Sequence, residues 1–478
     1  MNAVNPVPSN PVPMRPRELP AGPGANARVN DGAGARSGRP YRVHTQRDLD
    51  RITAVHHLPA AQRFAMKVVS TVLPFRVNDY VIEDLIDWDN VPADPIFQLT
   101  FPQPGMLAGA DFDRVADLLR RDAPRAELDA AVAEIRQALN PHPAGQRELN
   151  VPRLPNGEVV PGLQHKYRET VLFFPSQGQT CHAYCSFCFR WAQFVGDKTL
   201  RIATNEADKV HRYLLQHRQV TDLLFTGGDP MVMKTRHLKA YLEPLLRPEF
   251  DHVQTIRIGT KALTFWPYRF VTDADADELM DLLERLSAAG KHVALMAHFN
   301  HWRELDTDIC EQAIARIRAT GAQIRSQGPL LAHINADSDV WARLWKTQVR
   351  LGIVPYYMFV ERDTGAHQYF KLPLAQAWEI YHEAIQQVSG LSRTARGPSM
   401  SAGPGKVEVQ GMAEIGGERV FVLRFLQGRN PDWVNRPFFA RFDPEAFWLD
   451  DLKPAFGEER FFFEEEYQNR WLGMGFGD

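Results

Sequence analysis

Cysteine is scarce in this sequence, with only four among 478 residues. So few cysteines cannot form the disulfide framework that stabilises small secreted proteins. Long apolar runs are missing too, because no stretch approaches the roughly 20 apolar residues that a membrane-spanning helix needs. The formal net charge is -3, which is not the basic excess of proteins that bind nucleic acid or anionic membranes. These absences predict a protein that binds neither nucleic acid nor a membrane.

The composition that is present is that of an ordinary globular protein, with 44% hydrophobic and 24% charged residues. The N-terminus, MNAVNPVPSNPVPMRPRELPAGPG, lacks the basic and then apolar pattern of a secretory signal. Together with the few cysteines, this favours a cytoplasmic protein. The length is sufficient for two or three domains, or for one large domain with extensions.

Composition and hydrophobic spacing divide the chain into four regions. Residues 1–42 are rich in Pro, Gly, Asn and Arg, and we expect a disordered tail. Residues 43–160 have apolar residues at three- and four-residue spacing, which predicts a helical region in which Pro124 separates two helices. Residues 161–375 alternate β-rich runs with amphipathic helical stretches. Residues 376–478 are Gly-rich and end in RFFFEEEYQNRW, which we interpret as a solvated face rather than a subunit contact.

Six β-rich runs in the third region predict a partial barrel. They are TVLFFP (170–175), TDLLFTG (221–227), TIRIGT (255–260), HVALMAHF (292–299), AQIRSQ (322–327) and IVPYYMFV (353–360). Two of the helical stretches between them end at Gly290 and Gly321, as helices often do. Alternation of this kind implies parallel strands joined by right-handed crossovers. The prediction is therefore an α/β fold, a partial (β/α)6 barrel with a helical N-terminal region and a small C-terminal extension.

Three of the four cysteines, Cys181, Cys185 and Cys188, lie in TCHAYCSFCFR, directly after the first β-rich run. A structural zinc ion takes four ligands, and His182 is so close to Cys181 that it would strain to reach the same ion. A cubane iron–sulfur cluster held by only three thiolates leaves one iron open to a small molecule. The three cysteines therefore indicate an iron–sulfur cluster more than a zinc ion, at the carboxyl-terminal mouth of the barrel, where the sites of such folds lie.

A second candidate segment, FTGGDPM (225–231), follows the second β-rich run. Gly227 and Gly228 would let a ligand approach the backbone closely, and Asp229 supplies a carboxylate. Taken alone, the segment could equally be a strand-to-helix turn. Polar side chains also end the fourth and fifth runs, although a lone histidine is more often structural. The candidates there are His298, His301, Ser326 and Gln327.

The CxxxCxxC spacing after a first strand, with Phe187 before the third cysteine, resembles the radical S-adenosylmethionine (SAM) superfamily. In that superfamily the open iron chelates the amino and carboxylate groups of SAM, and one electron from the cluster releases a 5′-deoxyadenosyl radical. The GGD segment stands where the superfamily has a motif that binds the methionyl amino group. The resemblance implies that these three residues seat SAM, with His298 and Gln327 as further contacts.

A narrower resemblance is to the lysine 2,3-aminomutase family. It rests on HKYRETVLFF, CFRW, LLFTGGDPM, IRIGTKA, HFNH, LLAHIN and PYYMF, and it covers about residues 160–410. That family also uses pyridoxal phosphate (PLP) and moves an amino group between neighbouring carbons. The resemblance implies that Lys406, in SMSAGPGKVEV, forms the Schiff base with PLP. It further implies that Arg190 binds the substrate α-carboxylate and that Tyr167 lines the PLP pocket, although GPGK alone is a commonplace turn.

The chain departs from the lysine-specific members where they hold the distal ammonium of the substrate. Those members have two aspartates, whereas this chain has Ala336, followed by Asp337, and Ser399. Where the family has an arginine just before the core of the first strand, this chain has Thr170. The C-terminal zinc-binding cysteines of the lysine enzyme are absent from this chain. Free L-lysine is therefore not the expected substrate, unless Asp337 or another carboxylate replaces the lost one.

The sequence thus predicts a radical SAM, PLP-dependent enzyme with 2,3-aminomutase-like activity on an amino acid, with a [4Fe–4S] cluster, SAM and PLP as cofactors. The expected partners are this small-molecule substrate and an electron donor such as a flavodoxin or a ferredoxin, and assembly into a homo-oligomer is left open. The first alternative is a PLP-independent radical SAM enzyme that acts on a metabolite or a protein side chain. The second, a non-catalytic iron–sulfur or zinc protein, fits three cysteines and a following GGD poorly.

Overall fold

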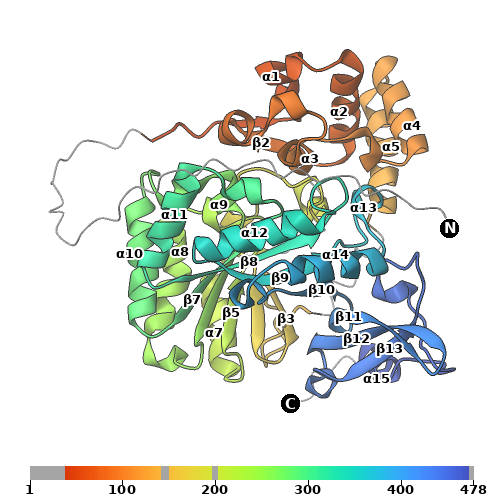
Figure 1. Cartoon of the computed structure of the whole chain (residues 1–478). Helices are drawn as coiled ribbons and strands as arrows, with labels where there is room; N and C mark the ends of the chain where they lie inside the picture. Colours follow the sequence, from red (N-terminus) through yellow and green to blue (C-terminus); the bar gives the residue numbers. More distant parts are fainter. Residues whose placement is uncertain (1–37, 141–149, 196–202, 473–478) are drawn as a thin grey trace. The chain divides into compact units, whose positions relative to one another are not determined.

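The structure is a computed structural model that describes residues 38–140, 150–195 and 203–472 (Figure 1). Most of the predicted tail, residues 1–37, lies outside the described residues. None of the helices in the described part of the chain has the length and apolar composition needed to cross a bilayer.

The centre of the fold is a curved sheet whose middle strands run parallel. In order across the sheet they are β4 (Thr170–Phe173), β5 (Asp222–Phe225), β6 (Thr255–Thr260), β7 (His292–His298), β8 (Gln323–Leu330), β9 (Val354–Val360) and β10 (Arg396–Ser401). The first six coincide with the six predicted β-rich runs. The predicted partial (β/α)6 barrel is therefore confirmed, and β10 adds a further parallel strand to it.

Amphipathic helices cover the outer face of this sheet (Figure 1). They are α7 (Ala207–Gln216), α8 (Thr235–Leu242), α10 (Ala276–Ala288), α11 (Asp308–Ala319), α12 (Ser338–Arg350) and α14 (Leu374–Gln386), with the short α9 (Ala262–Phe265) and α13 (His367–Phe370) beside them. Their apolar faces pack on the strands, so that Leu283, Ile314 and Leu295 belong to one buried core. Gly290 and Gly321, with φ of 85° and 82°, follow α10 and α11 as predicted.

The sheet is open, and its two edges are antiparallel. β3 (Leu163–Tyr167) pairs with β4 at one edge, and β11 (Gly405–Ile415), β12 (Glu418–Gly428) and β13 (Pro437–Arg441) continue from β10 to the other. Side chains join the two edges. Lys166 Nζ donates to the carbonyl oxygen of Ala402 at 2.6 Å, and Arg429 Nη2 donates to Asn150 Oδ1 at 2.8 Å. These contacts bridge the gap where a closed barrel would continue its ladder of backbone hydrogen bonds.

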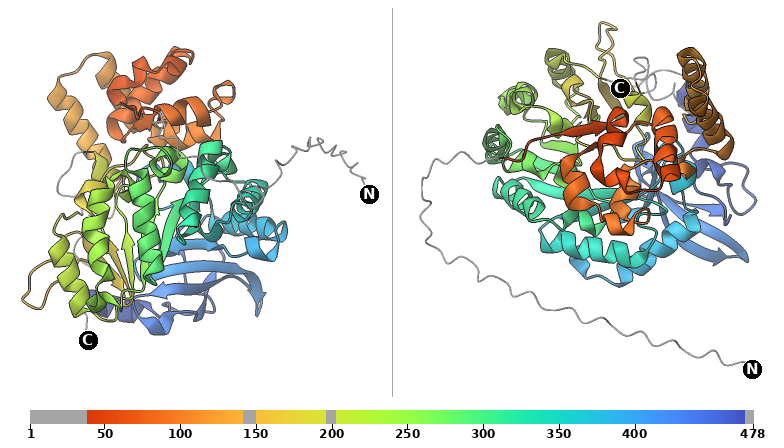
Figure 2. Two further views of the ribbon diagram at one scale, coloured as in Figure 1. Left: turned by 90° about the vertical axis from the view of Figure 1, so that its left-hand side faces the viewer. Right: turned by 90° about the horizontal axis from the view of Figure 1, so that it is seen from above.

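The N-terminal region contacts the loop that carries the three cysteines. It comprises β1 (Val43–Thr45), β2 (Arg76–Asn78), α1 (Thr53–His56), α2 (Ala60–Val72), α3 (Pro95–Thr100), α4 (Gly109–Arg120) and α5 (Arg125–Ala138). The backbone N–H groups of Tyr184 and Ser186 donate to the carbonyl oxygens of Arg76 and Leu99 at 2.8 and 2.9 Å. Seen from above in Figure 2, the orange helices of this region lie over the ring of barrel helices.

Two sequence expectations about local structure need correction or qualification. Pro124 is the N-cap of α5, as expected, but the predicted helical region of residues 43–160 is interrupted after α2 ends at Val72, because Pro74 follows and Arg76 begins β2. The interpretation of the terminal aromatic residues as a solvated face is wrong. Phe461 and Phe463 are only 6% and 3% exposed, because they pack against β12 and β13 ahead of α15 (Glu464–Leu472).

Candidate active site

The cysteine loop follows β4, at the end of the barrel where the parallel strands terminate. The N–H of Cys188 donates to the carbonyl oxygen of Cys185 at 3.1 Å, and that of Trp191 donates to the carbonyl oxygen of Cys188 at 3.0 Å, so the second half of the loop is a tight turn. Burial raises the pKa of all three cysteine thiols, to about 11 at Cys188. Thiols in such a place become thiolates only when a cation such as iron binds them.

The three cysteines of this loop are free thiols. Within the described ranges, no three histidine, cysteine or acidic side chains converge closely enough to hold a single metal ion. In a cubane cluster each thiolate binds a different iron, so the sulfur atoms stand further apart than the ligands of one zinc ion. Ligation of a [4Fe–4S] cluster by Cys181, Cys185 and Cys188 stays a prediction. The fourth cysteine, Cys310, is fully buried in the core of α11 and the barrel.

His182, which was considered above as a fourth ligand for zinc, is held in place by the N-terminal region. Asn78 Nδ2 and the hydroxyl of Tyr41 each donate to the carbonyl oxygen of His182 at 3.2 Å. The imidazole is buried, which lowers its pKa to about 3, so the ring is neutral. The backbone of this residue thus anchors the cysteine loop.

The GGD segment packs directly on the start of the cysteine loop. A Cβ at Gly228 would lie 2.4–2.7 Å from backbone atoms of Thr180, so no larger residue fits there. The carboxylate of Asp229, only 2% exposed, accepts hydrogen bonds from the N–H groups of Met231 and Lys261 and from Thr260 Oγ1, at 2.7–2.9 Å. These donors occupy the carboxylate, and the N–H of Gly228 donates to the carbonyl oxygen of Gly178 at 3.1 Å. The role of the GGD segment toward SAM stays a prediction.

His298 and Gln327 lie side by side on β7 and β8, as their neighbouring positions in the sheet require. Their Nε2 atoms are 2.7 Å apart. Burial, together with Lys261 and Arg190, lowers the pKa of His298 to about 3, so its imidazole is neutral. The influence of Arg190 also indicates that these two candidates and the arginine face the same space.

The other two polar candidates hold the fold instead. His301 Nδ1 accepts a hydrogen bond from the N–H of Arg303 at 3.2 Å and so caps a short helix. Ser326 Oγ donates to Gln348 Oε1 at 2.7 Å on the helical side of the sheet. Lys261, from the predicted RIGTKA segment, is likewise internal, because it donates to Asn300 Oδ1 at 3.0 Å and forms a buried ion pair with Glu304.

Arg190 joins the cysteine loop to the GGD segment. Its Nη1 donates to the carbonyl oxygen of Gly227 at 3.2 Å, and its guanidinium carbon lies 4.4 Å from the ring centroid of Phe174. Burial lowers the pKa of Arg190 to about 10, so the guanidinium is still charged at neutral pH. It forms no ion pair with a residue in the described part of the chain. A buried, unpaired guanidinium of this kind can bind a carboxylate.

Lys406 is the second residue of β11 and faces the aromatic side chains of β9. Its Nζ is 3.9 Å from the ring centroid of Tyr357 and 5.2 Å from that of Phe359. Burial, with added repulsion from Arg257 and Arg396, lowers the pKa of Lys406 to about 7. A large fraction of the amine is therefore neutral at physiological pH, as a Schiff-base lysine requires.

No family model matches the chain. A proposed L-lysine 2,3-aminomutase of Aquifex aeolicus (strain VF5) is 30% identical to it over 407 residues, which cover 84% of this chain and 94% of that relative. The chain belongs to the lysine 2,3-aminomutase family of the radical SAM superfamily.

Two further relatives carry the same family name. The L-lysine 2,3-aminomutase of Bacillus subtilis is 24% identical over 77% of this chain and 67% of that protein. The one from Escherichia coli is 28% identical over 48% of this chain and 64% of that protein. Among solved structures, a radical SAM methyltransferase from Sphaerobacter thermophilus is similar over 54% of this chain and 72% of that one, at 15% identity and a TM-score of 0.36. That likeness is too low to bear on the site.

The other predicted PLP contact, Tyr167, is the last residue of β3, on the same side of the barrel as Lys406. Burial raises the pKa of its phenol, and Lys166 Nζ lies 5.4 Å from its ring centroid. Burial, with Arg429, Arg362 and Lys406, lowers the pKa of Lys166, whose Nζ donates to the backbone of Ala402, four residues before Lys406. These contacts agree with the expectation that Tyr167 lines the PLP pocket of this family member. That role of Tyr167 stays a prediction.

Sequence reasoning missed several charged residues at the same mouth of the barrel. Glu361 and Arg362 follow β9, and both have a buried polar atom, Oε1 and Nε, without a hydrogen-bond partner. Arg429, after β12, donates from Nε to the carbonyl oxygen of Gly403 at 3.0 Å. The sequence contained a signal for Glu361 and Arg362, because the segment ERD directly follows the sixth β-rich run. Polar residues at the ends of the earlier runs are site candidates for the same reason.

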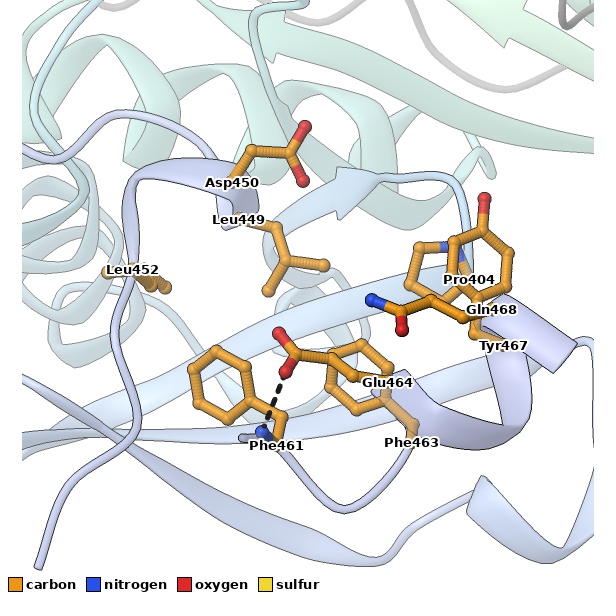
Figure 3. Close-up of a pocket in the computed structure, with 9 residues that line it drawn as sticks. All are labelled: Pro404, Leu449, Asp450, Leu452, Phe461, Phe463, Glu464, Tyr467 and Gln468. Atoms are coloured by element: carbon orange, nitrogen blue, oxygen red, sulfur yellow. Dashed lines mark hydrogen bonds between the residues drawn. The ribbon is translucent and has the colours of Figure 1, made fainter. Parts of the chain in front are cut away.

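A cavity of about 580 Å³ lies in the C-terminal part of this family member (Figure 3). Its lining residues are Pro404, Leu449, Asp450, Leu452, Phe461, Phe463, Glu464, Tyr467 and Gln468. None of them is a predicted site residue, although Pro404 is only two positions before Lys406. The cavity therefore borders the loop that carries Lys406.

Proposed function

We propose that this chain is a radical SAM, PLP-dependent aminomutase that moves an amino group between adjacent carbons of an amino acid. The observation that carries the proposal is the grouping at the barrel mouth of three free cysteines, a charged and unpaired Arg190, and Lys406 with its pKa lowered to about 7. Membership in the lysine 2,3-aminomutase family supports the reaction class.

Cys181, Cys185 and Cys188 would hold the [4Fe–4S] cluster, and the backbone at Gly227 and Gly228 would seat SAM beside it. When bound, the cluster supplies one electron that cleaves SAM and yields a 5′-deoxyadenosyl radical. The close packing of Gly228 on Thr180 fixes the distance between the SAM seat and the cysteine loop. Neutral His298, hydrogen-bonded to Gln327, adds a polar wall without introducing a charge.

Lys406 would carry PLP, which when bound stabilises a radical next to the migrating nitrogen. The aromatic rings of Tyr357 and Phe359 keep water from the lysine amine and so maintain its neutral, nucleophilic form. Arg190 would orient the substrate by two parallel hydrogen bonds to its α-carboxylate. The carbonyl oxygen of Gly227 accepts one N–H of Arg190 and so fixes the direction in which the rest of the guanidinium points.

Reconstitution of the cofactors distinguishes the PLP-dependent aminomutase from a PLP-independent radical SAM enzyme. Protein reconstituted anaerobically with iron, sulfide and PLP should bind about four irons per chain, cleave SAM on reduction, and absorb light as a PLP Schiff base. Lys406→Ala should lose the Schiff-base absorbance and retain the iron, while Lys346→Ala, at an exposed lysine of α12, should change neither.

If SAM is cleaved but PLP binds neither wild type nor variants through a lysine, the PLP-independent alternative is correct. If SAM is not cleaved after reduction of a fully loaded cluster, the radical mechanism itself is wrong.

A further inference from the structure

Five basic side chains gather at the barrel mouth: Lys166, Arg190, Arg362, Lys406 and Arg429. The guanidinium carbons of Arg190 and Arg362 lie 5.4 and 5.5 Å from the ring centroid of Phe189. The pKa of Lys166 is lowered by burial and then by Arg429, Arg362 and Lys406, which places all four in one neighbourhood. None of the five forms an ion pair with a residue in the described ranges.

Most of these basic side chains already have a partner or an assigned task. Lys166 and Arg429 donate to the backbone at Ala402 and Gly403, next to Lys406, and so belong to the lysine loop. Arg190 donates to Gly227 and faces the substrate α-carboxylate in the proposed function. Arg362 differs from them, because no side-chain hydrogen bond joins it to the described residues and its Nε is buried without a partner.

The loop after β9 holds Arg362 next to Arg190. Trp191 Nε1 donates to Thr364 Oγ1 at 3.1 Å, and the N–H of Gly365 donates to the carbonyl oxygen of Leu139 at 2.8 Å. Gly365 has a φ of 65°, and a Cβ there would come within 2.8 Å of the Trp191 ring. The loop is therefore fixed on the residue that follows Arg190, and the two guanidinium groups cannot drift apart freely.

The described mouth offers no matching carboxylate at the positions that distinguish lysine-specific relatives. Asp337 accepts a hydrogen bond from the N–H of Asp339 at 2.7 Å as the N-cap of α12, so it does not replace the lost aspartate. Ala336 packs against the barrel core, and Ser399 is fully buried with its hydroxyl 3.3 Å from the carbonyl oxygen of Met358. The carboxylates that remain near this place are Glu361, whose Oε1 is buried without a hydrogen-bond partner, and Asp363, both beside Arg362.

The acidic neighbours of Arg362 do not neutralise it by pairing. Glu361 and Asp363 both raise the pKa of Arg362 by their charge, yet neither lies within ion-pair distance of the guanidinium. Burial raises the pKa of Glu361 itself well above its ordinary value, which favours its uncharged form. Arg362 therefore has no ion-pair partner among the described carboxylates of its own loop.

We propose that Arg362 binds a second carboxylate, at the end of the substrate's side chain, so that the substrate is an acidic amino acid rather than lysine. The inference rests on the proposed function, in which Arg190 takes the α-carboxylate. Two guanidinium groups that both lie near the Phe189 ring would then bind the two ends of a dicarboxylate. Arg362 is a specificity-determining residue in this account.

Binding is measured by calorimetry on the anaerobically reconstituted, full-length enzyme with L-glutamate, L-aspartate, L-lysine and L-alanine as probes. In the wild type, one of the two acidic amino acids should bind at least about tenfold more tightly than L-lysine, because a charged pair replaces a repulsive contact. Arg362→Met should weaken the binding of that acidic probe by tenfold to a hundredfold, on the order expected for a lost charged hydrogen bond. L-alanine affinity and PLP absorbance should not change.

Two further variants keep the outcome interpretable. Arg362→Lys preserves the charge and should retain part of the affinity for the acidic probe even if Arg362→Met folds poorly. Arg212→Met, at an exposed arginine of α7, is the matched control and should behave as the wild type. Arg362→Asp should reverse the preference toward L-lysine.

Tighter binding of L-lysine than of either acidic probe by the wild type, or unchanged acidic-probe affinity in Arg362→Met, overturns the inference. Loss of PLP affinity in Arg362→Met, with the amino acid preference intact, also overturns it and assigns Arg362 to the phosphate of PLP. The two proposals fail separately. If an acidic amino acid binds in an Arg362-dependent way but its amino group does not migrate, the proposed aminomutase function is wrong. If L-lysine alone is isomerised, only the present inference about the substrate is wrong.

Discussion

At the scale of single residues, the chemistry of the site depends on how burial changes charge. Lys406 illustrates this, because its amine faces the rings of Tyr357 and Phe359 and its pKa falls to about 7. The unfolded chain holds its proton up to the ordinary lysine pKa of about 10.4. Between these two values the unfolded state binds more protons than the folded state, so the stability of the fold rises with pH across that window.

This imbalance predicts a pH-dependent effect of Lys406→Met in PLP-free, full-length protein. At pH 6 both states of the wild type carry the charge, so its burial costs stability on the order of a few kcal/mol, and the variant should be the more stable. Above pH 7 the advantage should shrink, and it should vanish near pH 10. Urea unfolding at several pH values measures it, and an advantage that is constant with pH would contradict the assigned shift.

The hydrogen bonds of Asp229 indicate a structural role for a residue that was predicted to contact SAM. Its carboxylate accepts three protein hydrogen bonds and ties the end of β5 to the end of β6. Asp229→Asn replaces one acceptor oxygen by a donor and should lower the free energy of unfolding by about 2–4 kcal/mol. Thermal unfolding checks this, with the exposed Asp432→Asn as the control. Unchanged stability together with lost SAM binding would instead give the carboxylate a direct role toward SAM.

At the scale of elements, the hydrophobic runs predicted β4 to β9 well, because each is a short apolar segment between amphipathic helices. β10 was missed, since its sequence, RGPSMS, contains Gly and Pro and resembles a turn. Its position depends on tertiary contact, because a Cβ at Gly397 would lie 2.3 Å from the carbonyl oxygen of Met358 on β9. Spacing in the sequence found the three cysteines, whereas nothing local indicated that Lys166 and Arg429 meet beside Lys406.

The packing of two loops gives a prediction at this scale. Gly228→Ala would place a methyl group 2.4–2.7 Å from the backbone of Thr180, the residue before Cys181, and backbone atoms cannot move aside easily. We expect the variant to retain less than about half of the wild-type iron after reconstitution, because the cysteine loop is displaced. Gly109→Ala, at an α4 position with no atom within 4 Å of the new Cβ, should bind iron normally. A full cluster in Gly228→Ala would show that the two loops are not coupled.

At the scale of the described molecule, distant segments meet at one mouth of the barrel. The N-terminal region holds the cysteine loop, and the last strands of the sheet bring Lys406 to the edge opposite β3. These contacts could not be predicted from local sequence patterns, since residues such as Asn78 and His182 are 104 positions apart. What could be predicted was each local segment and, through family resemblance, its role.

Asn78 tests whether the N-terminal region protects the cluster. Its side chain is fully buried and donates to the carbonyl oxygens of His182 and Phe265 at 3.2 and 2.8 Å. Asn78→Leu should lower the free energy of unfolding by about 2–3 kcal/mol, because buried carbonyl groups lose their donor. It should also accelerate the loss of iron in air several-fold, followed by absorbance near the cluster band. The exposed Asn205→Leu is the control, and equal rates of iron loss would refute a protective role.

The most direct test of the central claim follows a single amino acid through the enzyme. The fully reconstituted, reduced protein is incubated with SAM and with uniformly labelled L-glutamate, L-aspartate or L-lysine, and the products are separated by mass spectrometry coupled to chromatography. The account predicts that L-glutamate gives its β-amino isomer, 3-aminopentanedioate, of unchanged mass, whereas migration within L-aspartate regenerates aspartate and is followed as D-aspartate on a chiral column. Either product should form only when SAM, PLP and reductant are all present, and should be absent with Lys406→Ala. Cleavage of SAM to 5′-deoxyadenosine without any isomer of these amino acids would contradict it.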